Sequence, residues 1–84
     1  MEEVVASRLK EAADKAAEDT GFRIEIQKAG IRVTYMFDVK GIMYIHENIT
    51  SWRALGVAMN NPILMAMNDL KHGVDKFVKA LPDG

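Results

Sequence analysis

The side chains that could perform acid–base or metal chemistry are few in this chain. It has two histidines, His46 and His72, and no cysteine, which excludes a thiol nucleophile, an iron–sulfur site and a cysteine-bound zinc. His46 and Glu47 are adjacent, and adjacent residues of a strand point to opposite faces, so they do not form an acid–base pair. His72 shares a predicted helical face with Asp69 and Lys76, which is typical of a solvated cluster. We therefore predict no acid–base or metal site at either histidine.

Hydroxyl and glycine residues do not supply a catalytic motif either. Ser7 is expected in the middle of a helix and Ser51 at a helix cap, and neither lies in the strained turn typical of a serine nucleophile. The six glycines stand singly, at turns or inside helices, rather than in a phosphate-binding loop. We predict no catalytic residue, no metal ligand and no cofactor, and we expect that the protein is not an enzyme.

The unusual feature of the chain is an apolar segment rich in methionine. Five of the six methionines lie between Met36 and Met67, and Arg53 is the only charged residue from position 49 to 68. Methionine fills irregular gaps in protein cores, but with Trp and Tyr it is also favoured at interfaces between proteins. Three interpretations stay open: the segment is buried within the domain, it forms a surface for another chain, or it lies as a hairpin in a membrane interface, although it has few basic flanking residues for that.

Length and composition limit the class of protein. The 84 residues are expected to form one domain, 1–84, and a hydrophobic content of 49% excludes a disordered chain. The 11 basic and 12 acidic residues nearly cancel, which excludes a highly basic nucleic-acid arm. The acidic N-terminus lacks a secretory pattern, and the longest apolar stretch, 54–67, is shorter than the about 20 residues that span a bilayer. We expect a cytoplasmic protein with no membrane span.

Hydrophobic periodicity predicts the elements that position the Met-rich segment. Residues 2–18 carry an Ala-rich stripe at helical spacing, and they predict a helix that Gly21 ends in a left-handed conformation. Apolar and polar residues then alternate in three predicted strands, 22–27, 31–37 and 42–47. A first turn of two residues at Ala29-Gly30 or of four residues keeps the same parity, so the core face of the first hairpin is well specified.

The third strand is apolar on both of its faces. A three-residue second turn places Met43 and Ile45 on the core face and leaves Ile42 and Tyr44 on the opposite face with Met36. A two-residue turn exchanges these two sets, yet one apolar set still faces outward. Because a sheet with one solvated face normally alternates cleanly, we expect another helix or another chain to cover this face.

Two further helices complete the predicted fold. A helix capped at position 50 or 51 carries apolar residues at 52, 55 and 59, and Asn61-Pro62 begins a last helix that ends at about Leu81. The segment 63–67 is apolar on every side of this helix, so it is buried or forms an interface. The predicted class is a small single α+β domain of order α-β-β-β-α-α, with a three-stranded antiparallel meander packed by helices.

This element order resembles that of the double-stranded-RNA-binding domain, which contacts phosphate through the Lys-rich start of its last helix. The corresponding segment here, 61–65, contains no basic residue. Lys71, Asp75 and Lys79 alternate in charge, which indicates a solvated helix face rather than a phosphate track. The similarity is one of topology, and nucleic-acid binding is kept as the alternative function.

We therefore expect a non-enzymatic protein-interaction module, a small regulatory or inhibitory protein or subunit. Its partner is another protein or a second copy in a homodimer, bound through the apolar, Met-rich surface. The residues expected at this surface are Met36, Ile42, Tyr44, Trp52, Met59, Leu64 and Met65.

Overall fold

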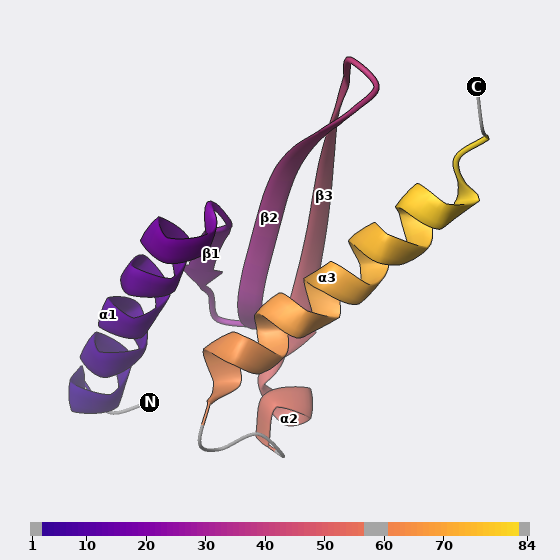
Figure 1. Cartoon of the computed structure of the whole chain (residues 1–84). Helices are drawn as coiled ribbons and strands as arrows, with labels where there is room; N and C mark the ends of the chain where they lie inside the picture. Colours follow the sequence, from indigo (N-terminus) through magenta and orange to yellow (C-terminus); the bar gives the residue numbers. More distant parts are fainter. Residues whose placement is uncertain (1–2, 57–60, 83–84) are drawn as a thin grey trace.

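The computed structural model describes residues 3–56 and 61–82, and its elements follow the predicted order (Figure 1). They are α1 (Glu3–Thr20), β1 (Arg23–Ile26), β2 (Gly30–Val39), β3 (Ile42–Ser51), α2 (Trp52–Leu55) and α3 (Pro62–Ala80). The strands form one antiparallel sheet in the order β1-β2-β3. The predicted α+β class and the three-stranded meander are confirmed.

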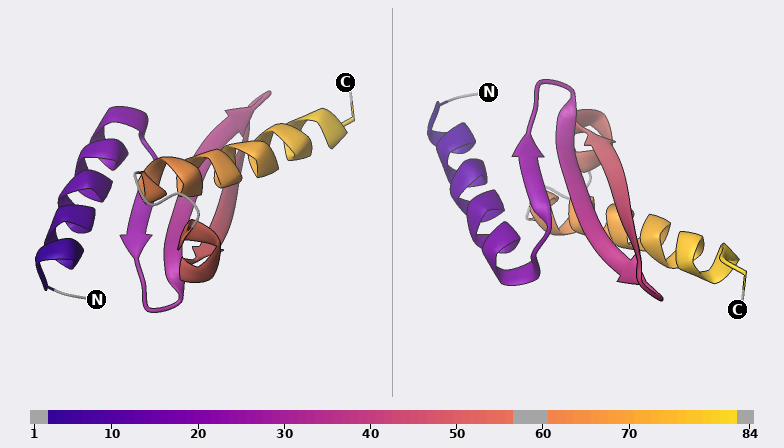
Figure 2. Two further views of the ribbon diagram at one scale, coloured as in Figure 1. Left: turned by 90° about the horizontal axis from the view of Figure 1, so that it is seen from below. Right: turned by 90° about the horizontal axis from the view of Figure 1, so that it is seen from above.

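The long helices pack on one face of the sheet, and no described element covers the other, which we call the outer face. Helix α1 lies alongside β1, whereas α3 crosses β2 and β3 (Figure 2). The core lies between these helices and the sheet, and its fully buried large side chains are Ile31, Val33 and Leu70. Alternate residues of β1 and β2 complete it, since Ile24 and Ile26 pack against the same cluster. One side of each strand is therefore dry and the other is open.

Local sequence signals account for the ends of the helices. Gly21 has a φ of 78°, and its N–H donates to the carbonyl oxygen of Ala17 at 2.9 Å, which closes α1 as predicted. The Asn61 side chain accepts a hydrogen bond from the N–H of Leu64 at 3.0 Å and caps α3, with Pro62 in its first turn. These local signals therefore determine where α1 ends and where α3 begins.

The first hairpin has the predicted parity. Ile26 lies opposite Ile31 and Ile24 opposite Val33, which leaves a four-residue loop, 27–30. The N–H of Gln27 donates to the carbonyl oxygen of Gly30 across this loop at 2.8 Å. Because this loop and a two-residue loop keep the same parity, the predicted core face of β1 and β2 is confirmed.

The second turn has two residues, so the expected three-residue turn is wrong. Val39 pairs with Ile42, and the turn residues Lys40 and Gly41 have φ values of 53° and 83°. Positive φ at both positions is what a type I′ turn requires, and its twist matches that of the flanking strands. The carboxylate of Asp38 accepts a hydrogen bond from the N–H of Gly41 at 3.0 Å and holds the turn.

This shorter turn reverses the faces expected for β3. Tyr44 and Ile42 are on the helix-covered side, while Met43 and Ile45 are on the outer face. Tyr44 is stabilised on the helix-covered side because its ring stacks on the ring of Phe37, with 5.7 Å between the two ring centroids. It also packs against the ring of Phe77 of α3 in a T-shaped arrangement, with 5.0 Å between the ring centroids. The aromatic cluster therefore selects the register that the apolar pattern leaves open.

A polar contact also joins β3 to α3. Thr50 is buried, and its hydroxyl donates to a carboxylate oxygen of Asp69 at 2.9 Å. The same hydroxyl accepts a hydrogen bond from the side-chain amide of Asn48 at 3.1 Å. A buried hydroxyl that both donates and accepts carries little desolvation cost, so this contact orients the base of β3 against the helix.

Gly73 lies where α3 crosses β3. A Cβ added at this position would be 2.8 Å from the Nε2 atom of His46, so the imidazole would have to move. We expect Gly73→Ala to raise the free energy of unfolding by about 1 kcal/mol in a His46→Ala background, through helix propensity alone. In the wild-type background the gain should be absent or reversed. Urea denaturation of the four proteins measures this coupling, and equal effects of Gly73→Ala in both backgrounds would contradict it.

Candidate protein-interaction surface

Three large apolar side chains lie together on the outer face, at the half of the sheet near the β2–β3 turn. Met36 and Met43 are each 58% exposed and Ile45 is 66% exposed. Met36 lies directly opposite Ile45, and Met43 is two residues from Ile45 on the same face of β3. We call these three residues the outer apolar patch, and it is a direct consequence of the two-residue turn.

The other half of the outer face is polar. An Nη atom of Arg32 donates to the carboxylate of Glu47 across β2 and β3, and the Nε atom of Arg23 lies 3.2 Å from a carboxylate oxygen of Glu25. The hydrogen bond to Glu47, reinforced by its negative charge, raises the pKa of Arg32 above its ordinary value. The Arg32–Glu47 pair therefore bounds the outer apolar patch, and Ile49 is a half-exposed apolar residue beyond it.

The structure separates the predicted surface residues on β2 and β3. Met36 belongs to the outer apolar patch, whereas Ile42 and Tyr44 lie on the helix-covered side, so the prediction that all three share a face is wrong. Tyr44 is half-buried against Phe77. Ile42 keeps 57% of its surface exposed, because α3 diverges from the hairpin toward the C-terminus (Figure 1).

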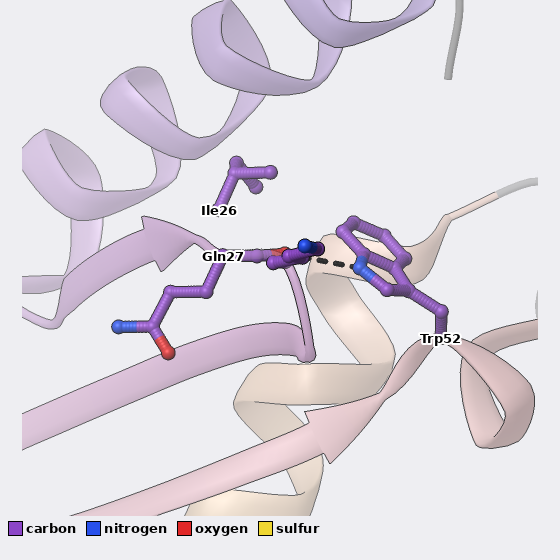
Figure 3. Close-up of a pocket in the computed structure, with 4 residues that line it drawn as sticks. Ile26, Gln27 and Trp52 are labelled. Atoms are coloured by element: carbon purple, nitrogen blue, oxygen red, sulfur yellow. Dashed lines mark hydrogen bonds between the residues drawn. The ribbon is translucent and has the colours of Figure 1, made fainter.

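The predicted residues on the helices do not reach the outer apolar patch. Trp52 is half-buried, and its indole N–H donates to the carbonyl oxygen of Gln27 at 3.0 Å, which ties α2 to the end of β1 (Figure 3). Leu64 is exposed on the first turn of α3, and Met65 packs against the core from the same turn. Met59 lies outside the described residues.

Met43 and Ile45 were not among the predicted contact residues. The signal that identifies them is the Lys40-Gly41 dipeptide, since glycine at the second central position favours a two-residue type I′ turn. Once the turn is known, the number of residues between the turn and a position in β3 determines on which face of the sheet that side chain lies. The alternation of apolar residues alone carries no such information here, because both parities of β3 are apolar.

A hollow of about 480 Å³ beside Trp52 is lined by Ile26, Gln27, Lys28 and Trp52. The polar atom of the indole is already bonded to the carbonyl oxygen of Gln27 (Figure 3). Small-molecule sites combine an apolar wall with several convergent polar groups. The residues that line this hollow offer only the exposed Lys28 and the Gln27 side chain, so they do not define such a site.

A second hollow of about 420 Å³ lies between the turn of the β2–β3 hairpin and the end of α3. We call it the tip groove, and it is lined by Val39, Lys40, Ile42, Tyr44, Val78, Leu81 and Pro82. Figure 1 shows that α3 and the hairpin spread apart at this end of the molecule. The groove is therefore continuous with the exposed side chain of Ile42.

Residues 3–56 and 61–82 offer neither a metal-binding cluster nor a membrane-spanning helix. Within these ranges, no three His, Asp or Glu side chains come together in a way that would hold a metal ion. No helix in the same part of the chain has the length and apolar character needed to cross a bilayer. No family model matches the sequence, and the comparisons find no similar curated protein or solved structure.

Proposed function

We propose that the protein is a non-enzymatic interaction module, a small regulatory or inhibitory protein or subunit that binds a protein partner through the outer apolar patch. The observation that carries this proposal is the group of Met36, Met43 and Ile45 on the uncovered face of the sheet. A partner that covers these side chains gains about 1 to 2 kcal/mol from each of them. The partner is another protein or a second copy of this chain.

The surroundings of the patch fit this role. Protein interfaces commonly have an apolar centre with a polar rim, and methionine adapts its shape to a partner. Here the Arg32–Glu47 ion pair lies at one side of the patch, and Asp38 lies opposite Met43 at the other. The patch is therefore framed by charged groups that remain solvated when a partner covers its centre.

The shape of the domain also supports a partner. Its radius of gyration is 14.0 Å and its extents are 50 × 23 × 19 Å. A compact chain of this length has a radius of gyration of about 12 Å. The protein is elongated, so it covers less of its own apolar surface than a compact domain of the same size.

Nucleic-acid binding, the alternative function, gains no support from the charges near the candidate surface. On the outer face, Arg23 and Arg32 form ion pairs with Glu25 and Glu47. The first turn of α3, where the RNA-binding domain of similar topology carries lysines, exposes Leu64 instead. Protein binding is therefore the function that these observations favour.

Ile45→Lys tests the proposal, because the side chain points away from the core and the fold should be retained. Light scattering behind a sizing column is the first measurement. A wild-type dimer would have twice the mass of 9.4 kDa, and Ile45→Lys should convert it to a monomer. If the wild type is monomeric, it is used to capture a partner protein from a lysate of the cells that naturally contain it. Calorimetry should then show that this partner binds Ile45→Lys at least about tenfold more weakly than it binds the wild type.

Ala12→Lys is the matched control, since it adds the same charge at an exposed position of α1. It should bind like the wild type. Circular dichroism of both variants should show the wild-type content of helix and strand. Equal binding by Ile45→Lys and the wild type would contradict the assignment of the outer apolar patch as the binding surface.

A further inference from the structure

We propose that the free edge of β3, together with the tip groove, binds an extended segment of a partner protein as a fourth strand of the sheet. This inference rests on the proposed function, because it specifies the kind of partner segment that a protein-interaction module of this shape receives. Strand addition is a common mode of recognition, in which backbone hydrogen bonds provide affinity and pockets for alternate side chains provide specificity.

The first argument is the direction of the backbone groups of β3. In an antiparallel pair, every second residue forms two backbone hydrogen bonds with the residue opposite it. The N–H and C=O groups of the residues between them point away from the partner strand. The pair that closes the two-residue hairpin, Val39–Ile42, is of the bonded kind. The hydrogen bond between Gln27 and Gly30 is consistent with this pattern. It indicates that the even-numbered residues of β2 direct their backbone groups to β1, so its odd-numbered residues direct theirs to β3.

The odd-numbered residues of β3 therefore direct their N–H and C=O groups to the outer edge of the sheet. No described strand pairs with that edge, since β3 ends the strand order. An open edge of this length favours pairing with another extended chain. The residues whose backbone groups are available are Met43, Ile45, Glu47 and Ile49.

The second argument is the position of the tip groove. Helix α3 crosses β3 at His46, where Gly73 lies, and its C-terminal half continues past the edge of the sheet (Figure 2). A strand added next to β3 at the usual spacing of about 4.8 Å would lie over this overhanging half. Half of its side chains would enter the tip groove beside Val78 and Leu81. The others would extend the outer apolar patch next to Ile45.

The chemistry of the groove defines the segment. Its walls are apolar, so the segment carries apolar residues at alternate positions. Lys40 is the charged residue among those that line the groove. An acidic residue of the segment near the hairpin turn would complement it.

A second copy of the chain fits this edge poorly. Its own β3 is already crossed by its own α3 at His46. Two β3 strands paired about that point would be about 4.8 Å apart, whereas packed helices need 8–10 Å between their axes, roughly twice that distance. The two α3 helices would therefore collide. A lone extended segment brings no helix, so we assign the edge to such a segment.

Amide hydrogen exchange of the free protein gives the first test. The amides of Met43, Ile45 and Glu47 should exchange about a hundredfold or more faster than those of Tyr44 and His46, which bond to β2. Peptides as long as β3, 10 residues, are then selected from a displayed random library against the wild-type protein. Enriched peptides should alternate in apolar character, and in a titration they should protect the odd-numbered amides of β3.

Two variants remove the edge and the groove separately. An N-methyl group on the Ile45 amide, introduced by chemical synthesis, leaves the side chain unchanged and should weaken the peptide at least about tenfold. Val78→Lys places a charge in the groove at an exposed helix position and should have a similar effect. Ala12→Lys is the control, because it lies on α1 away from the edge and the groove, and it should change peptide affinity by no more than about twofold. Met36→Lys, on the outer apolar patch, tests the proposed function through binding of the partner protein.

These variants separate this inference from the proposed function. If Met36→Lys abolishes partner binding while the N-methylated protein binds normally, the patch assignment stands and the strand-addition inference fails. It also fails if no peptide is enriched, or if the enriched peptides leave the odd-numbered amides unprotected. A wild-type dimer that the N-methyl group dissociates would show that a second copy occupies the edge, which would overturn the assigned occupant.

Discussion

Gly30→Ala is expected to lower the free energy of unfolding by about 4 kcal/mol or more. A Cβ at this position would lie 2.0 Å from the carbonyl oxygen of Thr50, 2.8 Å from the carbonyl carbon of Thr50 and 2.9 Å from the Cα of Ser51. All three atoms belong to the backbone of β3. No side-chain rotation can relieve the overlap, so the base of β2 must separate from β3.

This loss is comparable to the whole stability of a small domain, about 4 to 12 kcal/mol for a chain of this length. Circular dichroism should therefore show a protein that is largely unfolded or that unfolds at much lower urea concentration. Gly56→Ala is the control, because a Cβ there meets no atom of residues 3–56 and 61–82 within 4 Å and φ is −57°. It should change stability by less than about 1 kcal/mol. A Gly30→Ala protein as stable as this control would contradict the close approach of the strands.

Leu70→Ala is expected to lower the free energy of unfolding by about 3 to 4 kcal/mol. Leu70 is fully buried, in the cluster that joins α3 to Ile31 and Val33 of β2. Truncation removes its contacts and leaves a cavity that the sheet and the helix close only partly. In a domain of this size such a loss lowers the melting temperature by more than about 10 °C.

Leu64→Ala is the matched control for Leu70→Ala. It removes the same atoms from the same helix at a side chain that is 47% exposed, so the loss should stay near or below about 1 kcal/mol. Thermal unfolding followed by circular dichroism measures both variants. Equal losses would mean that α3 is not oriented with Leu70 toward the sheet.

The ends of the elements could be predicted because they depend on local chemistry. Asn61 and Pro62 define the start of α3 through a side-chain cap and a preset φ, and Gly21 ends α1 because it tolerates a left-handed conformation. The sequence equally predicts which faces of β1 and β2 pair on the core side of the sheet. Each of these strands has one apolar face, so only one parity buries it.

The orientation of β3 depended on the tertiary structure. Its odd-numbered and even-numbered residues are both apolar, and a turn shorter by one residue turns every side chain to the other face. Burial of apolar area distinguishes the two faces weakly. The aromatic contacts of Tyr44 with Phe37 and Phe77 favour one of them. The contact with Phe37 comes with the pairing of β2 and β3, whereas the contact with Phe77 exists only once α3 lies across the sheet.

The candidate site was accessible from the sequence only in part. Sequence alone determined that an apolar set would remain on the outside of the β2–β3 hairpin, because a short sheet with helices on one side has a single dry face. It did not determine that this set is Met36, Met43 and Ile45, since that follows from the turn. That β3 is an edge strand follows from the predicted meander. The tip groove was decided by the path of α3, because side-chain periodicity specifies faces and carries no information on where a helix leaves a sheet.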